Sequence, residues 1–198
     1  SVCQVAAQSD RQALMVKDKR PVYRFSFFAI SSHPSRIAEI KSPSSETAFF
    51  NFLASHDGVG LNPVRGILDE AEIGFLVETV EAGGGLTSYK SNPNGSTSPY
   101  ELNVNYFDAL ALPGEPPLGA PLERFMLAQA IMLCLAGVPG IYFHSLFGSR
   151  GWREGVVLRR SNRAINRQKL RLADLEAELA DQTSLRLHVF QRYRALLR

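Results

Sequence analysis

A histidine and an aspartate stand side by side where an aromatic run ends. Residues 48–54 read AFFNFLA, and Ser55, His56, Asp57 and Gly58 follow. A carboxylate accepts hydrogen bonds from two neighbouring hydroxyl groups and an imidazole donates one more, so the pair suits a polyhydroxylated ligand. The alternative is that Asp57 caps the following turn and His56 is an ordinary polar side chain. From the dipeptide alone this structural alternative is preferred, because short motifs often match by chance.

A second group of polar residues lies in a long stretch rich in Gly and Pro. Tyr100, Glu101, Leu102 and Asn103 follow Pro99 there. A tyrosine ring offers a stacking face to a sugar, and an asparagine offers hydrogen bonds. Alternatively the segment is a turn after Pro99 with Tyr100 packed on the core, and taken alone this second interpretation is again favoured.

A third group is basic. Arg163, Asn166 and Arg167 lie in a stretch, residues 150–171, that holds eight Lys or Arg and one acid, Glu154. Guanidinium groups bind phosphate or carboxylate through paired hydrogen bonds. The alternative is the solvated basic start of a helix. Nucleic-acid binding would need exposed aromatic residues among these charges, and only Trp152 is near.

These polar groups need a scaffold, and the apolar pattern predicts an α/β one. The run 48–54 is nearly continuous in apolar character, which is typical of a strand buried on both faces of a parallel sheet. Residues 121–136 predict a helix that is apolar on nearly all sides, and 138–144 predict a second buried strand. Strand, helix and strand form one βαβ unit, whose strand ends are where such sheets place their sites.

Other segments are predicted from their caps. Asp69 with Glu72 three residues later opens a helix over 69–80. Helices are also expected over 168–179 and 184–197, the last capped by Thr183 or Ser184. The stretch 62–119 is long enough to be a functional loop or an inserted subdomain. Residues 1–47 are poorly patterned.

Composition excludes several classes of protein. The chain has 198 residues, a net charge of +3 and 45% hydrophobic residues, which is ordinary for a folded domain and not for a disordered one. It has no apolar run long enough for a membrane span and no visible secretory signal. Cys3 and Cys134 cannot form a zinc site or a disulfide framework, and Cys134 is expected in the core. We therefore expect a cytoplasmic protein without metal or cofactor.

Several long blocks, in order, resemble one family. The sucrose-phosphorylase-like branch of glycoside hydrolase family 13 is similar to FFNFLASHDGVGLNPVRGIL (49–68), GGGLTSYK (83–90), SPYELNVNYFDAL (98–110), RFMLAQAIMLCLAGVPGIYFHSLFGSR (124–150) and RAINRQKL (163–170). That branch includes sucrose, sucrose 6'-phosphate and glucosylglycerate phosphorylases. The resemblance runs from about Phe49 to the end of the chain.

The resemblance implies a fold and a reaction. The family is a (β/α)₈ (TIM) barrel with a retaining mechanism, in which an Asp nucleophile forms a glucosyl-enzyme, a Glu is the acid/base, and phosphate replaces water as acceptor. By position, Asp57 corresponds to the acid that stabilises the transition state and His56 to its glucose-binding neighbour. Arg163 corresponds to an arginine of the donor-sugar and phosphate site. Tyr100 and Glu101 correspond to the mobile loop that shapes the acceptor site.

Two parts of the family pattern are absent from the sequence. Nothing resembles the motifs of the nucleophile Asp or the acid/base Glu, and the chain supplies two or three of eight strands. We therefore expect the C-terminal part of a barrel in residues 48–198, with an inserted loop subdomain over 62–119 and a poorly matched segment over 1–47. A chain without the nucleophile cannot form the covalent intermediate, so it should be inactive alone.

Two other functions stay open. The chain could be a non-catalytic sugar-binding or structural remnant that pairs with a second polypeptide, or a nucleic-acid binder that uses residues 150–171. The expected partners are a glucosyl sugar, inorganic phosphate and the missing part of the barrel, with no nucleic acid and no membrane.

Overall fold

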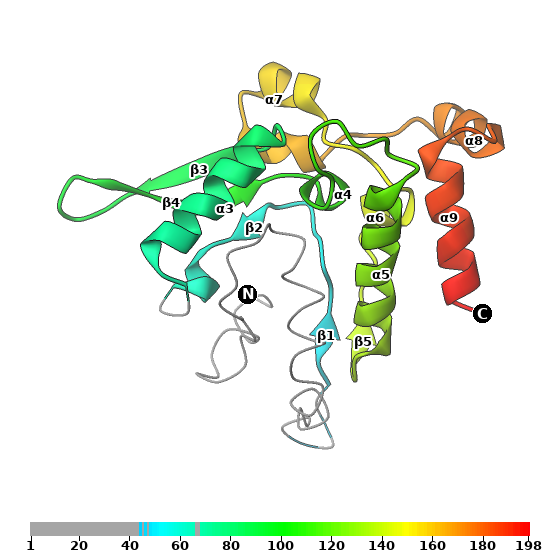
Figure 1. The fold of residues 1–198 in the computed structure, drawn as a ribbon, viewed down its shortest axis with the longest axis horizontal. Helices are drawn as coiled ribbons and strands as arrows, with labels where there is room; N and C mark the ends of the chain where they lie inside the picture. Colours follow the sequence, from blue (N-terminus) through cyan, green and yellow to red (C-terminus); the bar gives the residue numbers. More distant parts are fainter. Residues whose placement is uncertain (1–43, 45, 47, 66–67) are drawn as a thin grey trace.

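A computed structural model gives the fold and describes residues 44, 46, 48–65 and 68–198 (Figure 1). Residues 1–43, for which we expected a poorly matched segment, lie outside the part of the chain that the structure describes. A two-stranded parallel sheet, a three-stranded antiparallel sheet and a set of short helices make up the described part. The chain is thus α/β, as predicted.

The parallel sheet confirms the predicted strand–helix–strand unit. Strand β1 (Phe50–Asn51) pairs in parallel with β5 (Val138–Pro139), and helix α5 (Ala120–Cys134) lies between them in sequence. Both strands are far shorter than the apolar runs predicted. Our expectation of burial on both faces is wrong, since Phe50 is 53% exposed and Val138 55% exposed. No further strand of the described chain pairs with either one, so the outer edges of this sheet are also unpaired.

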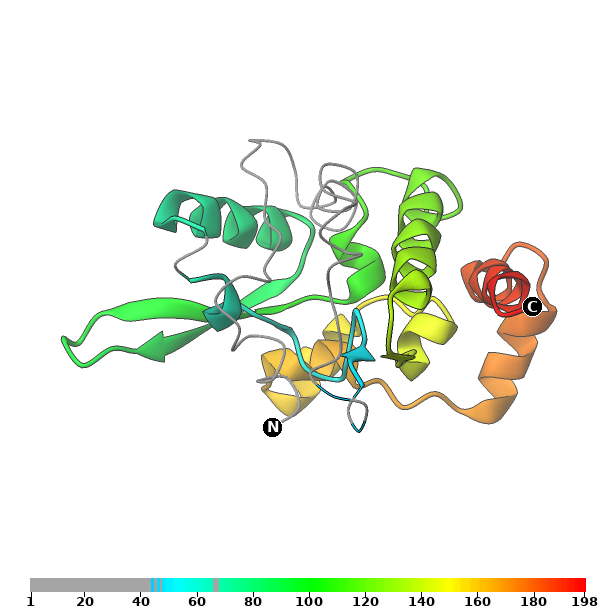
Figure 2. The ribbon, with the colours of Figure 1, turned by 90° about the horizontal axis from the view of Figure 1, so that it is seen from below.

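The antiparallel sheet was not predicted. Strands β2 (Val59–Gly60), β4 (Thr97–Asn103) and β3 (Leu86–Ser91) lie in the order β2-β4-β3. Strands β3 and β4 form a hairpin whose tip extends away from the helices (Figures 1 and 2). Gly95 has φ +80° in its turn, a conformation that favours glycine. Tyr100 and Glu101 therefore lie on a strand and not in a loop or a turn.

Helix α3 (Glu70–Ala82) covers one face of this sheet, and the short helix η3 (Asn162–Asn166) packs against the same sheet (Figure 2). The predicted capping box is confirmed, because the Asp69 side chain accepts from the Glu72 backbone and the Glu72 side chain accepts from the Asp69 backbone. A first core cluster joins α3 to the sheet through Ile73, Leu76, Val77, Val80, Leu61, Leu102 and Val104.

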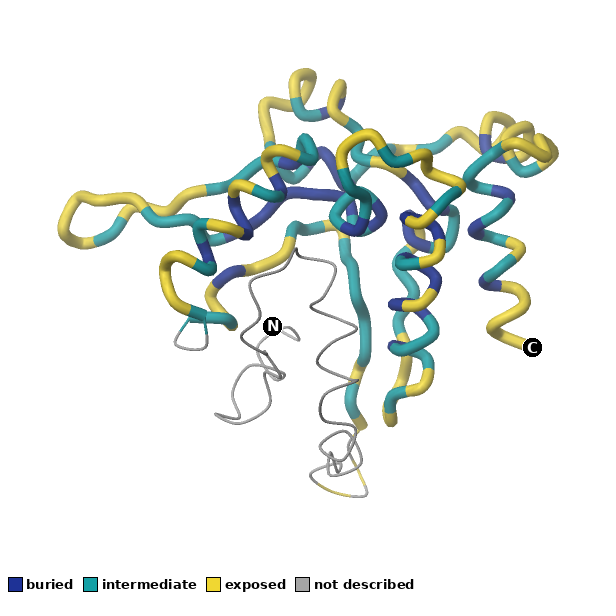
Figure 3. Tube along the Cα trace, viewed as in Figure 1, coloured by how far each residue is buried: buried dark blue, intermediate teal, exposed yellow. Residues whose placement is uncertain are grey.

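A second core cluster forms where α5 packs beside α9 (Leu185–Leu196) and α4 (Tyr106–Ala109). Phe125 and Tyr193 are fully buried there, and their rings meet edge to face at 6.5 Å. Figure 3 shows this burial as alternating stripes along both helices. Ser184 caps α9 by accepting from the Arg186 backbone, as predicted.

The prediction that α5 is buried on nearly all sides is wrong. Leu127 is 42% exposed, and Cys134, which we expected in the core, is exposed at the last turn. The physical reason is that α4 and α9 cover one face of α5, and no element of the described chain covers the face that carries these two residues. One face of the helix is therefore exposed, although Glu123, Arg124 and Gln129 are its only polar side chains.

The remaining elements connect these two clusters. They are η2 (Asn62–Val64), α6 (Phe143–Leu146), α7 (Arg153–Arg159) and α8 (Leu172–Ala180). Helix α6 contains His144, which we expected at the end of a strand, and α7 was not predicted. None of the helices in the described segments has the length and apolar character that crossing a membrane requires. The described residues also hold no His/Cys/Asp/Glu cluster arranged to bind a metal ion.

Candidate functional site

The Asp57 carboxylate lies between two arginines of the basic segment. The Arg167 Nη2 donates to Asp57 Oδ1 at 2.7 Å, and Arg163 Nη1 lies 3.5 Å from the same oxygen. Arg167 Nε also donates to the His56 carbonyl at 3.2 Å, so the arginine holds both backbone and side chain of this turn. His56 Nε2 is 3.6 Å from the other carboxylate oxygen, Oδ2. Asp57 thus keeps one oxygen beside the imidazole, with 37% of its side chain exposed.

Glu101 is joined to this group through Arg163. The Arg163 Nε and Nη2 donate to the two Glu101 oxygens at 3.0 and 2.6 Å, a two-pronged arrangement that suits a guanidinium and a carboxylate. Asn103 also donates to Glu101 and accepts from Ser88 at 2.5 Å. The hydrogen bond with Glu101 raises the pKa of Arg163 above its ordinary value. Glu101 is buried while 41% of the Arg163 side chain is exposed, so the guanidinium is the part that a ligand can reach.

The strand geometry explains why these two side chains meet. Successive side chains on a strand alternate between the faces of the sheet. Glu101 and Asn103 therefore lie on the face of β4 against η3, whereas Leu102 joins α3 in the core on the other face. Strand β4 has a bulge at Tyr100, because Glu101 pairs with Ser88 and Pro99 pairs with Tyr89, and Tyr100 adds to the raised pKa of Arg163. No hydrogen bond links Tyr100 to the other candidate side chains within the described chain.

Asn166 ties together the segments that carry the site. Its side-chain amide donates to the backbone oxygens of Asp57 at 3.3 Å and Val104 at 3.1 Å. The backbone carbonyl of Asn166 accepts from the Tyr142 hydroxyl at 2.6 Å. Burial raises the pKa of that hydroxyl, so it remains a donor at neutral pH. The turn after β1, the end of β4 and the segment after β5 therefore meet at one buried asparagine.

Gly58 allows the Asp57 turn to approach β4 closely. A Cβ at this position would lie 2.3 Å from the Leu102 carbonyl oxygen and 2.9 Å from Asn103 Nδ2. Any larger residue must move the turn, and with it the carboxylate of Asp57.

Four of the five residues selected from sequence are thus brought together: His56, Asp57, Glu101 and Arg163. Tyr100 contributes to the raised pKa of Arg163, but no hydrogen bond joins it to the other four side chains within the described residues. Sequence reasoning singled out Arg167 and Asn166 as a basic group without linking them to Asp57. Asn103 was considered as a sugar-binding residue, whereas in the structure it donates to Glu101. Gly58 and Tyr142 were not selected for the site, and no local pattern marks Tyr142.

The site combines two carboxylates and two guanidinium groups, so its formal charge is balanced. The solvent-facing part includes the Asp57 carboxylate, the His56 imidazole and the guanidinium groups of Arg163 and Arg167. Carboxylate and imidazole are suited to neighbouring sugar hydroxyls, and a guanidinium is suited to an anion such as phosphate.

Comparison with known proteins finds relatives among glycoside phosphorylases. No family model matches the chain. Glucosylglycerate phosphorylase from Spirochaeta thermophila is 49% identical over 160 residues, which are 80% of this chain and 27% of that protein. Sucrose 6(F)-phosphate phosphorylase from Ilumatobacter coccineus is 28% identical over 144 residues, 68% of this chain and 26% of that protein.

A solved structure shows a similar fold. The sucrose 6F-phosphate phosphorylase from Thermoanaerobacter thermosaccharolyticum superposes with a TM-score of 0.59 at 23% identity, over 75% of this chain and 28% of that one. The resemblance to glucosylglycerate and sucrose phosphorylases is therefore confirmed, and this chain is their homologue. The chain spans little more than a quarter of the length of these relatives, which fits a C-terminal part of them.

Proposed function

We propose that this chain forms the C-terminal part of the catalytic barrel of a retaining glycoside phosphorylase, which transfers glucose between phosphate and an acceptor hydroxyl. The parallel strands β1 and β5, joined through α5, are two neighbouring strands of that (β/α)₈ barrel. Residues 62–119 are an insertion that carries β3 and β4. The reaction takes place in the cytoplasm on a glucosyl sugar and inorganic phosphate.

The observation that carries this proposal is the Asp57–Arg163–Glu101 network after β1, in a chain 49% identical to a glucosylglycerate phosphorylase. Asp57 accepts hydrogen bonds from sugar hydroxyls as positive charge develops on the ring in the transition state. His56 and Arg163 contact the glucose and the phosphate. Tyr100 and Glu101 shape the acceptor pocket, and the higher identity favours a glycerate-type acceptor over a fructose-type one.

The nucleophile Asp and the acid/base Glu then come from polypeptide other than this chain. The exposed β1–β5 pair supports a partner that supplies further parallel strands, because parallel sheets are normally covered on both faces. That partner is the part of the barrel that precedes the matched region in the relatives.

Co-expression tests the proposal directly. The 198-residue chain is produced with the part of the Spirochaeta thermophila relative that precedes the matched 160 residues, and phosphorolysis of glucosylglycerate is measured as release of glucosyl phosphate. We expect the two polypeptides to purify together and to be active, while the chain alone shows no turnover. Turnover by the chain alone would contradict the missing-nucleophile argument.

Two variants separate chemistry from assembly. Asp57→Asn should lower activity of the assembled pair by about 10²–10³-fold, as loss of a transition-state contact does, without affecting co-purification. Asp174→Asn, at a carboxylate that is 64% exposed on α8, is the matched control and should leave activity unchanged. Co-purification without activity would favour the alternative of a non-catalytic subunit, and separate elution would rule out assembly.

The nucleic-acid alternative loses support from the ion pairs. Arg163 and Arg167 are engaged with Glu101 and Asp57, and Arg150 forms an ion pair with Asp108. The Arg159 guanidinium lies over the Trp152 ring at 5.2 Å. The positive charge of residues 150–171 is thus partly neutralised within the fold, where a polyanion would need it free.

A further inference from the structure

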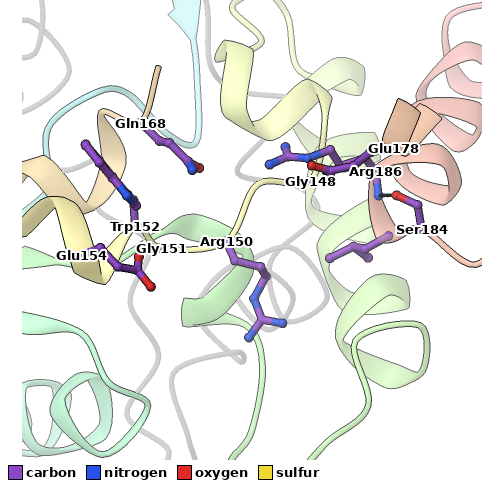
Figure 4. Close-up of a pocket in the computed structure, with 10 residues that line it drawn as sticks. Gly148, Arg150, Gly151, Trp152, Glu154, Gln168, Glu178, Ser184 and Arg186 are labelled. Atoms are coloured by element: carbon purple, nitrogen blue, oxygen red, sulfur yellow. Dashed lines mark hydrogen bonds and ion pairs between the residues drawn. The ribbon is translucent and has the colours of Figure 1, made fainter. Parts of the chain in front are cut away.

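A hollow of about 200 Å³ lies between the start of α7 and the start of α9. Its residues come from the segment after α6, from η3's C-terminal side and from the α8–α9 connection: Gly148, Arg150, Gly151, Trp152, Glu154, Gln168, Glu178, Ser184, Leu185 and Arg186. Figure 4 shows Trp152, Glu154 and Gln168 on one side and Glu178, Ser184 and Arg186 on the other. None of the five candidate residues of the Asp57 site lines it.

The hollow joins half-buried apolar surface to charged groups at its rim. Trp152 and Leu185 are half-buried, whereas Arg150, Glu154 and Glu178 are exposed. The indole is held in place, because Gly155 leaves room for it (a Cβ there would lie 2.0 Å from a ring carbon) and Arg159 lies over the ring. An immobilised aromatic ring with polar groups around it is the usual composition of a sugar-binding surface.

Several polar groups of the hollow are available to a ligand. The side chains of Gln168 and Glu154 make no hydrogen bond or ion pair with any part of the chain that the structure describes. Arg186, in contrast, is held within the fold: its Nε donates to Glu178 at 2.5 Å, and its Nη1 donates to Ser149 Oγ at 2.7 Å and to the Phe147 carbonyl at 3.3 Å. One amide and one carboxylate thus face the hollow with their donors and acceptors unused.

The charges select a neutral ligand. Glu154 and Glu178 would repel a phosphate or carboxylate, and Arg150 and Arg186 would repel an amine. A hydroxyl group both donates and accepts, so it can bind beside every one of these side chains. The volume of about 200 Å³ is enough for one sugar ring within the hollow.

We propose that this hollow is an accessory carbohydrate site that binds a single pyranose ring, with Gln168 and Glu154 as its hydrogen-bonding residues. It is separate from the Asp57 site, although the two are linked along the chain. Arg167 contacts Asp57 and the next residue, Gln168, lines the hollow.

The chain carries a built-in reporter for this site. Trp152 is the single tryptophan of the sequence, so intrinsic emission on excitation of indole reports the hollow alone. The test is a titration of the 198-residue chain with glucose, with glycerol at matched viscosity as the solvent control. We expect a saturable emission change with glucose and a linear, smaller one with glycerol.

Variants then assign the binding. Gln168→Ala should weaken glucose binding by about tenfold, the loss expected from one or two hydrogen bonds. Gln182→Ala, an exposed glutamine outside the hollow, is the matched control and should change the Kd less than twofold. Asp57→Asn should also leave it unchanged, which separates this site from the proposed catalytic one. Circular dichroism verifies that each variant is folded.

Three outcomes would overturn the proposal. They are a non-saturating response to glucose, an equal affinity in the Gln168→Ala variant, and saturation by inorganic phosphate in place of glucose. Loss of glucose binding in Asp57→Asn but not in Gln168→Ala would move the sugar to the Asp57 site and would likewise reject the hollow.

Discussion

Glu101 is the one carboxylate that is buried in the described part of the chain, and its counter-ion is only half-buried. Removing one partner of such a pair leaves a charge without compensation, which costs more than the pair contributes when intact. Arg163→Gln should therefore lower the free energy of unfolding by about 2 kcal/mol, less than for a fully buried pair because Arg163 is 41% exposed. Urea denaturation at neutral pH measures the change.

Arg167→Gln provides the matched control for Arg163→Gln. Its partner Asp57 is 37% exposed, so water can solvate the carboxylate once the guanidinium is gone. We expect a loss below about 1 kcal/mol. Equal losses for the two variants would show that Glu101 is not desolvated in solution.

His144 makes folding sensitive to mild acid. Burial lowers the pKa of the imidazole below its ordinary value of 6.5; a hydrogen bond with the Gln168 backbone acts in the opposite direction, and Arg186 lowers it further. In the unfolded chain the imidazole takes up a proton near pH 6.5, whereas in the folded chain it does so only at lower pH. The free energy of unfolding is therefore unaffected by His144 above pH 6.5 and decreases as the pH falls from 6.5 toward the folded-state pKa.

The variant His144→Gln should therefore show a smaller loss of stability between pH 7.5 and pH 5 than the parent chain. Urea titrations at these two pH values provide the comparison, and Ser149, which is hydrogen-bonded to His144 at 2.8 Å, stays in place in both proteins. An identical pH dependence would mean that His144 protonates freely in the folded state.

At the scale of the element, we expect alanine substitutions at two glycines to change stability in opposite directions. Gly58→Ala places a methyl group against the Leu102 carbonyl and should destabilise the chain by about 2 kcal/mol, as strained packing does. Gly74→Ala lies within α3, where a Cβ meets nothing within 4 Å, and should stabilise by about 0.5–1 kcal/mol through the higher helix propensity of alanine. Thermal melts of the two variants should shift in opposite directions, and a stable Gly58→Ala chain would show that the Asp57 turn does not need its close contact with β4.

Local signals allowed some elements to be predicted. The caps at Asp69 and Ser184 were identifiable from sequence because each acts within three residues. The hairpin of β3 and β4 was missed because its strands are rich in Ser and Thr and because Pro99 suggested a turn. Pro99 is tolerated in β4 at a position where β2 no longer runs alongside it.

The candidate site could be predicted only in part for the same reason. Residue types and their places in the chain singled out His56 and Asp57, the Tyr100–Glu101 segment and Arg163 as candidates. The family resemblance then gave these five residues their expected roles. The contact of Arg167 with Asp57 joins residues 110 positions apart, and no local pattern predicts it. The prediction that Cys134 is buried was wrong, because the burial of a helix residue depends on whether another element packs against its face. The sequence of the helix does not contain that information.

At the scale of the whole molecule, the uncovered β1–β5 sheet favours association. Unpaired strand edges and exposed apolar faces promote pairing with other chains. We expect the isolated chain to self-associate, and Val138→Lys to reduce the apparent mass in sedimentation experiments. Val157→Lys, at a residue 78% exposed on α7, is the control and should leave association unchanged. A monodisperse parent chain would contradict this expectation.

Because Asp57 and Arg167 are 110 positions apart in sequence, they are synthesised at different times. A ribosome adds about 5–20 residues per second, so the carboxylate precedes its arginine by roughly 5 to 20 s. For nearly all of that interval the turn after β1 lacks the ion pairs of Asp57 with Arg163 and Arg167. It also lacks the hydrogen bond from the Asn166 side chain to the Asp57 backbone. The polar centre is therefore completed only after strands β2 to β5 and helices α3 to α7, which lie between these two residues in sequence, have been made.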